Sequence, residues 1–250
     1  MNPAVELDGA CVAFDGGRGL DGVSATLAQG RTVALIGPSG AGKSTLLRLV
    51  AGMRAPTAGT VLTLGQPLAS LRGTAYRTLR DRVGMLEQGD TLTPGLSVLH
   101  NVFAGRLGRW SAARAVRNRV LPRAADTDDA RETLHAVELA DRMHADPETL
   151  SGGERRRVAL ARLAFQAPTV WLADEPTAGL DPRLRRETAD LLLRLVRERD
   201  GAAIVALHDL ELLSCDFDEV WGLRNGVLEF TAPAQALEQA RIDALYEACP

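Results

Sequence analysis

Lysine is the rarest charged residue of this sequence. Among 250 residues Lys43 is the only lysine, and the other 28 of the 29 basic residues are arginines. The 32 acidic residues bring the net charge to −3. A slightly acidic chain has no general attraction for nucleic acid or anionic lipid, so the composition argues against a nucleic-acid partner.

Cysteines and long apolar runs are scarce as well. Cys11, Cys215 and Cys249 are far apart and form no CxxC motif, which argues against a disulfide framework and predicts reduced thiols. No apolar run approaches the ~18 residues of a membrane-spanning helix, and residues 1–4 do not open a signal peptide. If the protein works at a membrane, we therefore expect a partner to dock it there.

A glycine-rich loop stands between an apolar run and a helical pattern. Residues 32–36 have the pattern of a buried strand, and residues 46–50 continue with helical character. The loop between them fits G-x-x-x-x-G-K-[ST], the motif of a phosphate-binding loop. Its residues are Gly37, Pro38, Ser39, Gly40, Ala41, Gly42, Lys43, Ser44 and Thr45. Strand, turn and helix follow one another as this motif requires, which leaves a chance match as a minor alternative.

This loop is suited to a polyphosphate. Its glycines let the backbone turn sharply and present N–H groups with no Cβ in the way, and the following helix adds the positive end of its dipole. We expect Lys43 to reach the β- and γ-phosphates of a nucleoside triphosphate and Ser44 to hold Mg²⁺. The only lysine of the chain thus stands where a compact ammonium fits and a planar guanidinium does not.

The order of the expected elements predicts an α/β fold. Strands are expected at 5–7, 11–14, 23–27, 60–64 and 83–87, with a helix at 68–80. The β signals then stop, and helices are expected at 97–107, 111–120, 126–139 and 151–165. Strands alternate with a helix again at 170–173, 182–199, 202–207, 219–223 and 227–231, which indicates a mostly parallel sheet, and a polar helix follows Pro233. We expect one domain over 1–250, with a core of residues 1–88 and 166–250 and an inserted helical lobe of residues 89–165.

Two adjacent carboxylates, Asp174 and Glu175, end the apolar run 170–173. Phosphoryl transfer to water needs a carboxylate that holds Mg²⁺ through its water shell and a second group that orients or deprotonates the attacking water. Asp174 fits the first task and Glu175 the second. An acidic pair that caps a helix before Pro176 is the structural alternative, and the upstream loop makes it the weaker one.

The segment 150–154, Leu-Ser-Gly-Gly-Glu, opens a helix that continues with three arginines. Ser151 and Glu154 have the spacing of a capping box, so a plain well-capped helix is a serious alternative. Gly152 and Gly153, however, are costly in a helix and have no evident structural purpose. They would let a ligand approach the helix N-terminus closely, as in a second anion site.

Taken together, these motifs resemble the ATP-binding cassette of ABC transporters. The resemblance rests on residues 37–45, Gln88, 150–154, 174–175, 179–181 and His208, in this order and spacing, and covers nearly the whole chain. It implies a P-loop NTPase fold with a mostly parallel sheet, an N-terminal antiparallel β subdomain and an inserted helical lobe. It also implies an ATP-dependent head-to-tail homodimer, in which Ser151, Gly152 and Gly153 of one subunit close on the ATP held by the other.

The resemblance further implies roles for single residues in nucleotide and metal binding. Phe14 would stack on the adenine, although from the pattern alone a buried strand residue is an equal alternative. Gln88 would touch Mg²⁺ and the attacking water, with Ser44 and Asp174 as the other metal-binding residues. The implied cofactors are therefore ATP and Mg²⁺.

The catalytic group that the resemblance implies consists of Glu175, His208 and Gln88. His208 would contact the γ-phosphate, whereas a histidine at a strand end is by itself more often a local hydrogen-bonding residue. Asp181 would lie in the loop that crosses the dimer interface.

Three stretches, residues 96–102, 105–110 and 240–246, look like those of phosphonate-import ATPases. For Trp110, packing inside the lobe is an equal alternative to contact with a partner. The resemblance implies the ATPase subunit of a bacterial importer for phosphonate or a related phosphorus oxyanion. Its partners would be integral-membrane permease subunits and a periplasmic-type or lipoprotein substrate-binding protein, and it would lie in the cytoplasm against the inner face of the cell membrane.

Two other functions stay open from the sequence. The first is an ABC transporter ATPase for another substrate, and the second is a soluble ABC ATPase that acts on nucleic acid or ribosomes. Proteins of the second kind typically carry a long coiled-coil insertion or two cassettes. This sequence shows neither, nor a basic stripe. A cassette that no longer hydrolyses ATP is disfavoured because every chemical position is filled.

Overall fold

The computed structural model describes residues 3–14, 17–89 and 92–247. An antiparallel sheet of order β2-β1-β4-β5 is formed by the N-terminal part of the chain. Its strands are β1 (Val5–Phe14), β2 (Gly17–Leu27), β4 (Ala58–Thr63) and β5 (Gln66–Pro67). The expected antiparallel β subdomain is therefore confirmed.

One detail of this subdomain differs from the prediction. Asp8 and Gly9 were expected to separate two short strands, but β1 runs through them. Gly9 has φ +56°, and the pairing with β2 shifts register between Leu7 and Ala10. A bulge therefore takes up the irregularity, and the strand continues.

The second sheet has the order β10-β9-β3-β8-β7-β6. Its members are β3 (Thr32–Ile36), β6 (Val83–Leu86), β7 (Val170–Asp174), β8 (Ala202–Ala206), β9 (Glu219–Arg224) and β10 (Val227–Pro233). Only β10 pairs antiparallel, at the edge. Every residue of β3, β7 and β8 is buried, as expected for parallel strands covered on both faces. The mostly parallel sheet is confirmed.

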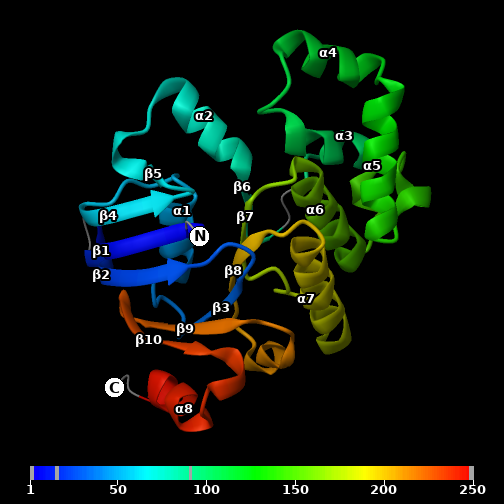
Figure 1. Ribbon diagram of the computed structural model, residues 1–250. Helices are drawn as coiled ribbons and strands as arrows, with labels where there is room; N and C mark the ends of the chain where they lie inside the picture. Colours follow the sequence, from blue (N-terminus) through cyan, green and yellow to red (C-terminus); the bar gives the residue numbers. More distant parts are fainter. Residues whose placement is uncertain (1–2, 15–16, 90–91, 248–250) are drawn as a thin grey trace.

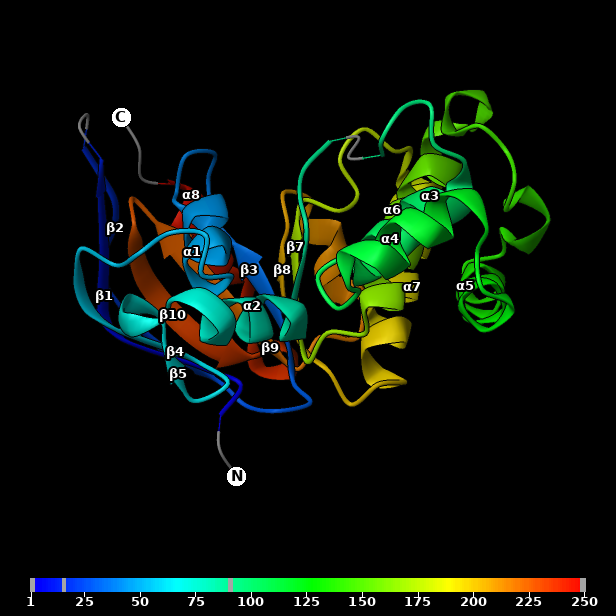
Figure 2. The ribbon, with the colours of Figure 1, turned by 90° about the horizontal axis from the view of Figure 1, so that it is seen from above.

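Each face of this sheet belongs to a different core. Val33 and Leu35 of β3 pack with α1 (Lys43–Val50) and the antiparallel sheet. Ala34 and Ile36 pack on the other side, toward α7 (Pro182–Arg197) and the helices between β6 and β7. Alternate side chains of a strand point to opposite faces, so one strand serves both cores. Figures 1 and 2 show the parallel strands between the antiparallel sheet and these helices.

The remaining helices have the following bounds. They are η1 (Leu68–Ser70), α2 (Gly73–Arg82), α3 (Val98–Phe103), η2 (Ala104–Arg106), α4 (Ala112–Val120), α5 (Ala124–Ala136), η3 (Ala140–Arg142), η4 (Pro147–Thr149), α6 (Gly152–Gln166), η5 (Leu210–Ser214), η6 (Ala234–Ala236) and α8 (Gln239–Glu247). The helix expected at 68–80 is thus split into η1 and α2. Among the described residues we find no helix with the length and apolarity needed to cross a membrane.

The helical lobe has an aromatic centre. Phe103 of α3 meets Trp110 at 5.3 Å between ring centroids, and Phe165 of α6 lies 6.4 Å from Trp110. Trp110 is only 8% exposed. Aromatic rings in such edge-on contacts are usual core residues, so the structure supports the packing alternative for Trp110.

Candidate active site

The glycine-rich loop connects the buried strand β3 to α1, at the carboxyl edge of the parallel sheet. Gly42 is the N-cap of α1 with φ +106°. A Cβ on Gly37 would run into the carbonyl oxygen of Leu223 in β9, and one on Gly42 would run into the carbonyl oxygen of Gly19. Glycine is therefore required at both positions by the close approach of neighbouring backbone.

Lys43 folds back over this loop. Its Nζ donates hydrogen bonds to the carbonyl oxygens of Gly37 at 2.7 Å and of Pro38 at 3.2 Å, and the residue is 6% exposed. Burial lowers the pKa of the ammonium, while the nearby carboxylates of Glu175 and Asp174 act in the opposite direction. The only lysine of the chain thus lies between loop carbonyls and two carboxylates.

The first turn of α1 offers unpaired backbone donors. The first hydrogen bond of the helix runs from the N–H of Leu46 to the carbonyl of Gly42 at 2.9 Å. The N–H groups of Lys43, Ser44 and Thr45 therefore have no carbonyl partner within the helix. No side chain of the described residues caps this end. These donors and the helix dipole together favour an anion in front of the loop.

A cleft of about 490 Å³ opens over the loop. Besides residues 39–45 it is lined by Gln88, Glu175 and His208. Gln88 Nε2 donates to Glu175 Oε2 at 2.8 Å. Glu175 follows β7 with an unusual φ of +47°, and its N–H donates to the carbonyl of Ala206 at 3.1 Å. Strained backbone of this kind is concentrated at functional sites.

The oxygen donors beside Lys43 fit the chemistry of a magnesium ion. Asp174, the last residue of β7, is 2% exposed, and its carboxylate accepts no hydrogen bond from the described residues. The Ser44 hydroxyl and the Gln88 amide are the other predicted donors. Mg²⁺ prefers such hard oxygens and keeps several waters. No cluster of three His, Cys, Asp or Glu side chains occurs within the described chain, so a metal here would depend on this mixed set.

His208 is one of the residues that line the cleft over the loop, whereas Asp181 is not. His208 follows β8, while the Asp181 carboxylate caps α7 by accepting from the N–H of Leu184 at 3.1 Å. Arg185, which sequence reasoning missed, links their two loops. Its guanidinium donates to the carbonyl of Leu180 at 2.7 Å and to Asp209 Oδ2 at 2.9 Å. The hydrogen bond from Arg185 lowers the pKa of the Asp209 carboxyl.

Ser151 begins α6 with the expected capping box. Its Oγ accepts from the N–H of Glu154 at 3.2 Å, and Glu154 Oε2 accepts from the N–H of Ser151 at 2.8 Å. A Cβ on Gly152 would meet no atom of the described residues within 4 Å. Packing against the described residues therefore does not explain the glycine.

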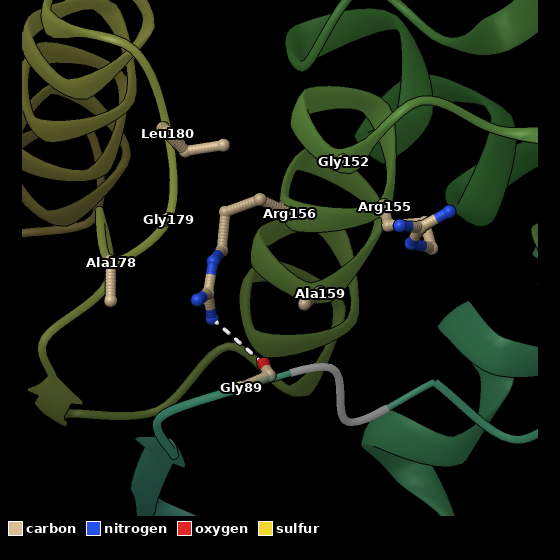
Figure 3. Close-up of a pocket in the computed structure, with 8 residues that line it drawn as sticks. All are labelled: Gly89, Gly152, Arg155, Arg156, Ala159, Ala178, Gly179 and Leu180. Carbon is tan, nitrogen blue, oxygen red and sulfur yellow. Dashed lines mark hydrogen bonds between the residues drawn. The ribbon is translucent and has the colours of Figure 1, made fainter.

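Gly152 lines a cleft of its own, of about 210 Å³, together with Gly89 and the segment 178–180. Figure 3 shows Arg156 reaching from α6 into this space, where its guanidinium donates to the carbonyl of Gly89 at 3.1 Å. Among the described residues that line them, this cleft and the one over the loop have no member in common. The structure thus brings residues 39–45, Gln88, Glu175 and His208 together but leaves Gly152 elsewhere.

The side chain of Phe14 and the whole of Cys249 lie outside what the structure describes. Phe14 ends β1, but its side chain is not among those described, so its stacking on a base stays a prediction. The same holds for the thiol of Cys249. Of the other cysteines, Cys11 is half-buried and Cys215 is buried, and both are free thiols.

Comparison with known proteins places this geometry in a family. The family described as ABC transporter matches residues 20–178. The chain is 40% identical over 245 residues to the phosphonates import ATP-binding protein PhnC of Pseudomonas putida, covering 98% of this chain and 90% of that protein.

Solved structures agree with this match. The fold is similar to cbiO1 from Clostridium perfringens, part of the ABC transporter complex cbiONQ, with a TM-score of 0.81, 25% identity, and coverage of 99% of this chain and 100% of that one. It is also similar to the cassette MJ0796 in a dimeric post-hydrolysis state bound to ADP and Pi, with a TM-score of 0.77, 28% identity, and coverage of 93% and 100%.

Proposed function

The chain belongs to the ABC transporter family, and we propose that it is the ATP-hydrolysing subunit of a bacterial importer for phosphonate or a related phosphorus oxyanion. One observation carries the ATPase function. A single cleft holds the Lys43 ammonium in its glycine loop and the Gln88–Glu175 pair opposite it. The substrate class is supported by the relative named for phosphonate import, which matches 98% of this chain.

In the proposed mechanism the loop binds and orients the phosphates of ATP. The free N–H groups at the start of α1 and the Lys43 ammonium neutralise their charge. Ser44, Asp174 and Gln88 would hold Mg²⁺, which when bound neutralises charge on the β- and γ-phosphates. The side-chain oxygens of these three residues are hard ligands of the kind that Mg²⁺ prefers, which supports magnesium binding here.

Hydrolysis requires a base beside the γ-phosphate. Glu175 Oε2, held at 2.8 Å by the Gln88 amide, takes the proton of the attacking water, and His208 contacts the γ-phosphate. Phe14 would stack on the adenine. The roles of Glu175 and His208 rest on their motif positions and on the cleft that they share with the loop, and the role of Phe14 rests on its motif position alone.

The second half of each site comes from a second copy of the chain. Ser151 and Gly152 lie at the N-terminus of α6, Gly152 lines a separate cleft, and no atom of the described residues fills the space next to Gly152. We therefore propose an ATP-dependent, head-to-tail homodimer, with Asp181 at its interface. The dimeric state of the similar cassette MJ0796 supports this arrangement.

Coupling to transport would run through the helical lobe. We propose the division into a core of residues 1–88 and 166–250 and a lobe of residues 89–165, which transmits motion to integral-membrane permease subunits. A periplasmic-type or lipoprotein binding protein would deliver the substrate. The chain would then lie at the cytoplasmic face of the cell membrane.

Growth on a single phosphorus source tests this proposal. Deleting the gene should abolish growth of its source organism on a phosphonate but not on inorganic phosphate. The wild-type gene should restore growth, whereas the Lys43→Ala variant should not, because it lacks the ammonium that binds phosphate. Unchanged growth of the deletion strain on phosphonates would contradict the substrate class, and ATP binding by purified Lys43→Ala with normal affinity would contradict the proposed site.

A further inference from the structure

The last helix of the chain touches the first residue of the phosphate loop. The N–H of Gly37 donates a hydrogen bond to the phenol oxygen of Tyr246 at 3.0 Å, across 209 residues of sequence. Tyr246 belongs to α8 and to the stretch 240–246, and the family match, which covers residues 20–178, does not include it. The proposed mechanism of ATP hydrolysis does not use this contact.

Helix α8 is anchored so that this contact is held in place. Ile242 and Leu245 are 7% and 2% exposed and join the core beside β9. Arg224 of β9 donates to the carbonyl of Ala244 at 3.2 Å, and its guanidinium is itself held by Glu229 at 3.0 Å. Figure 1 shows α8 beyond β9 and β10. The phenol of Tyr246 is thus carried by a helix that is packed and hydrogen-bonded to the sheet.

Gly37 connects this helix to the lysine through the two peptide groups that flank its Cα. On one side the N–H of Gly37 is bound by Tyr246, and on the other its carbonyl accepts from Lys43 Nζ at 2.7 Å. The carbonyl of Leu223 lies so close that a Cβ on Gly37 would collide with it. The N–H of Gly37 belongs to the Ile36–Gly37 peptide group, and its carbonyl belongs to the Gly37–Pro38 group. The phenol therefore holds the first group in place, and through the Cα of Gly37 it restrains where the carbonyl that binds the Lys43 ammonium can lie.

We propose that Tyr246 is a positioning residue of the nucleotide site. It holds the peptide group between Ile36 and Gly37 and so restrains the next carbonyl, that of Gly37, which keeps the Lys43 ammonium where the phosphates of ATP bind. The inference rests on the proposed function, since it assigns a further residue to the same site. It makes the C-terminal helix a part of that site.

Replacing Tyr246 by phenylalanine removes the acceptor and keeps the ring. The N–H of Gly37 then loses its partner, and the loop binds phosphate less well. Loss of one such hydrogen bond should raise KM for MgATP about three- to tenfold. Lys43 contacts the phosphates both in the bound substrate and in the transition state, so a displaced ammonium weakens both to a similar degree. The kcat should therefore stay within about twofold of the wild-type value.

The chain offers a matched control in Tyr76, the other of its two tyrosines. Its phenol donates to the carbonyl of Gly52 at 3.1 Å, beyond the far end of α1. Tyr76→Phe likewise removes one hydrogen bond between a phenol and the backbone, here one that the phenol donates, without touching the loop. Its KM for MgATP should equal that of the wild type.

The experiment compares KM, kcat and thermal unfolding of the wild type and both variants. A higher KM in Tyr246→Phe alone, with kcat retained, supports the proposal. An unchanged KM in Tyr246→Phe, or an equal rise in Tyr76→Phe, overturns it, as does a lower kcat at normal KM, which would indicate partial unfolding. A wild type that neither binds nor hydrolyses ATP would contradict the proposed function and this inference with it, whereas equal KM values contradict only the role of Tyr246.

Discussion

Replacing Glu175 with glutamine separates nucleotide binding from hydrolysis. The variant keeps the length and branching of the side chain, so it should accept the backbone conformation at φ +47°. Its amide oxygen can still accept the hydrogen bond that Gln88 Nε2 donates at 2.8 Å. The change therefore removes one thing, the basic carboxylate that faces the cleft.

The size of the effect follows from this geometry. A positioned general base contributes roughly 10²–10⁴-fold to the rate, which corresponds to about 3–5 kcal/mol of activation free energy. The turnover of ATP should fall by that factor. ATP binding should stay the same or tighten, because the variant lacks a negative charge near the phosphates. Two subunits should then remain joined by the ATP that they cannot hydrolyse.

Phosphate release at saturating MgATP, nucleotide titration and light scattering measure these three properties. Glu87→Gln is the matched control: it makes the same chemical change next to Gln88, at a side chain that is 48% exposed and 4.0 Å from Arg48. This control should hydrolyse ATP at the normal rate. A Glu175→Gln protein whose rate lies within tenfold, roughly, of the wild type would refute the assignment of the base.

Two further changes test other parts of the molecule. Gly152→Asp should leave the thermal stability unchanged or higher, because an acidic residue in the first turn of α6 interacts favourably with the helix dipole by about 0.3–1 kcal/mol. It should abolish ATP-dependent dimerisation and hydrolysis, and a dimer of normal affinity in light scattering would contradict the composite site. Asp126→Ala should lower the free energy of unfolding at pH 7 by about 2–3 kcal/mol, since Asp126, 3% exposed, accepts from Arg114 at 2.5 Å. Burial alone would raise the pKa of Asp126, but the hydrogen bonds to its carboxylate outweigh this and lower it. Its contribution is therefore complete above the unfolded-state pKa of about 3.9 and is lost as the pH falls through the folded-state pKa. Urea unfolding should show the difference between wild type and variant shrinking below that pH, and a constant difference would contradict the pKa argument.

The loop, the buried strands and the order of the elements could be predicted from the sequence because each has a local signal. The residue types and spacing of 37–45 match the motif of a phosphate-binding loop. The apolar runs of β3, β7 and β8 are long enough to be identified as strands. The exact ends of the helices and strands have no such local signal. The bulge at Gly9 and the separation of η1 from α2 depend on pairing and packing that a local pattern does not contain.

The sequence by itself thus determined the chemistry of the site, because a phosphate cradle needs certain residues in a contiguous loop. Only the tertiary structure decided which distant residues support it. Arg185 and Arg156 carry no signal in a chain with 28 arginines, and Tyr246 reaches Gly37 across 209 residues. Such contacts arise when β9 and β3 pair and α8 packs beside them, and no local pattern encodes that geometry because it is a property of the folded sheet.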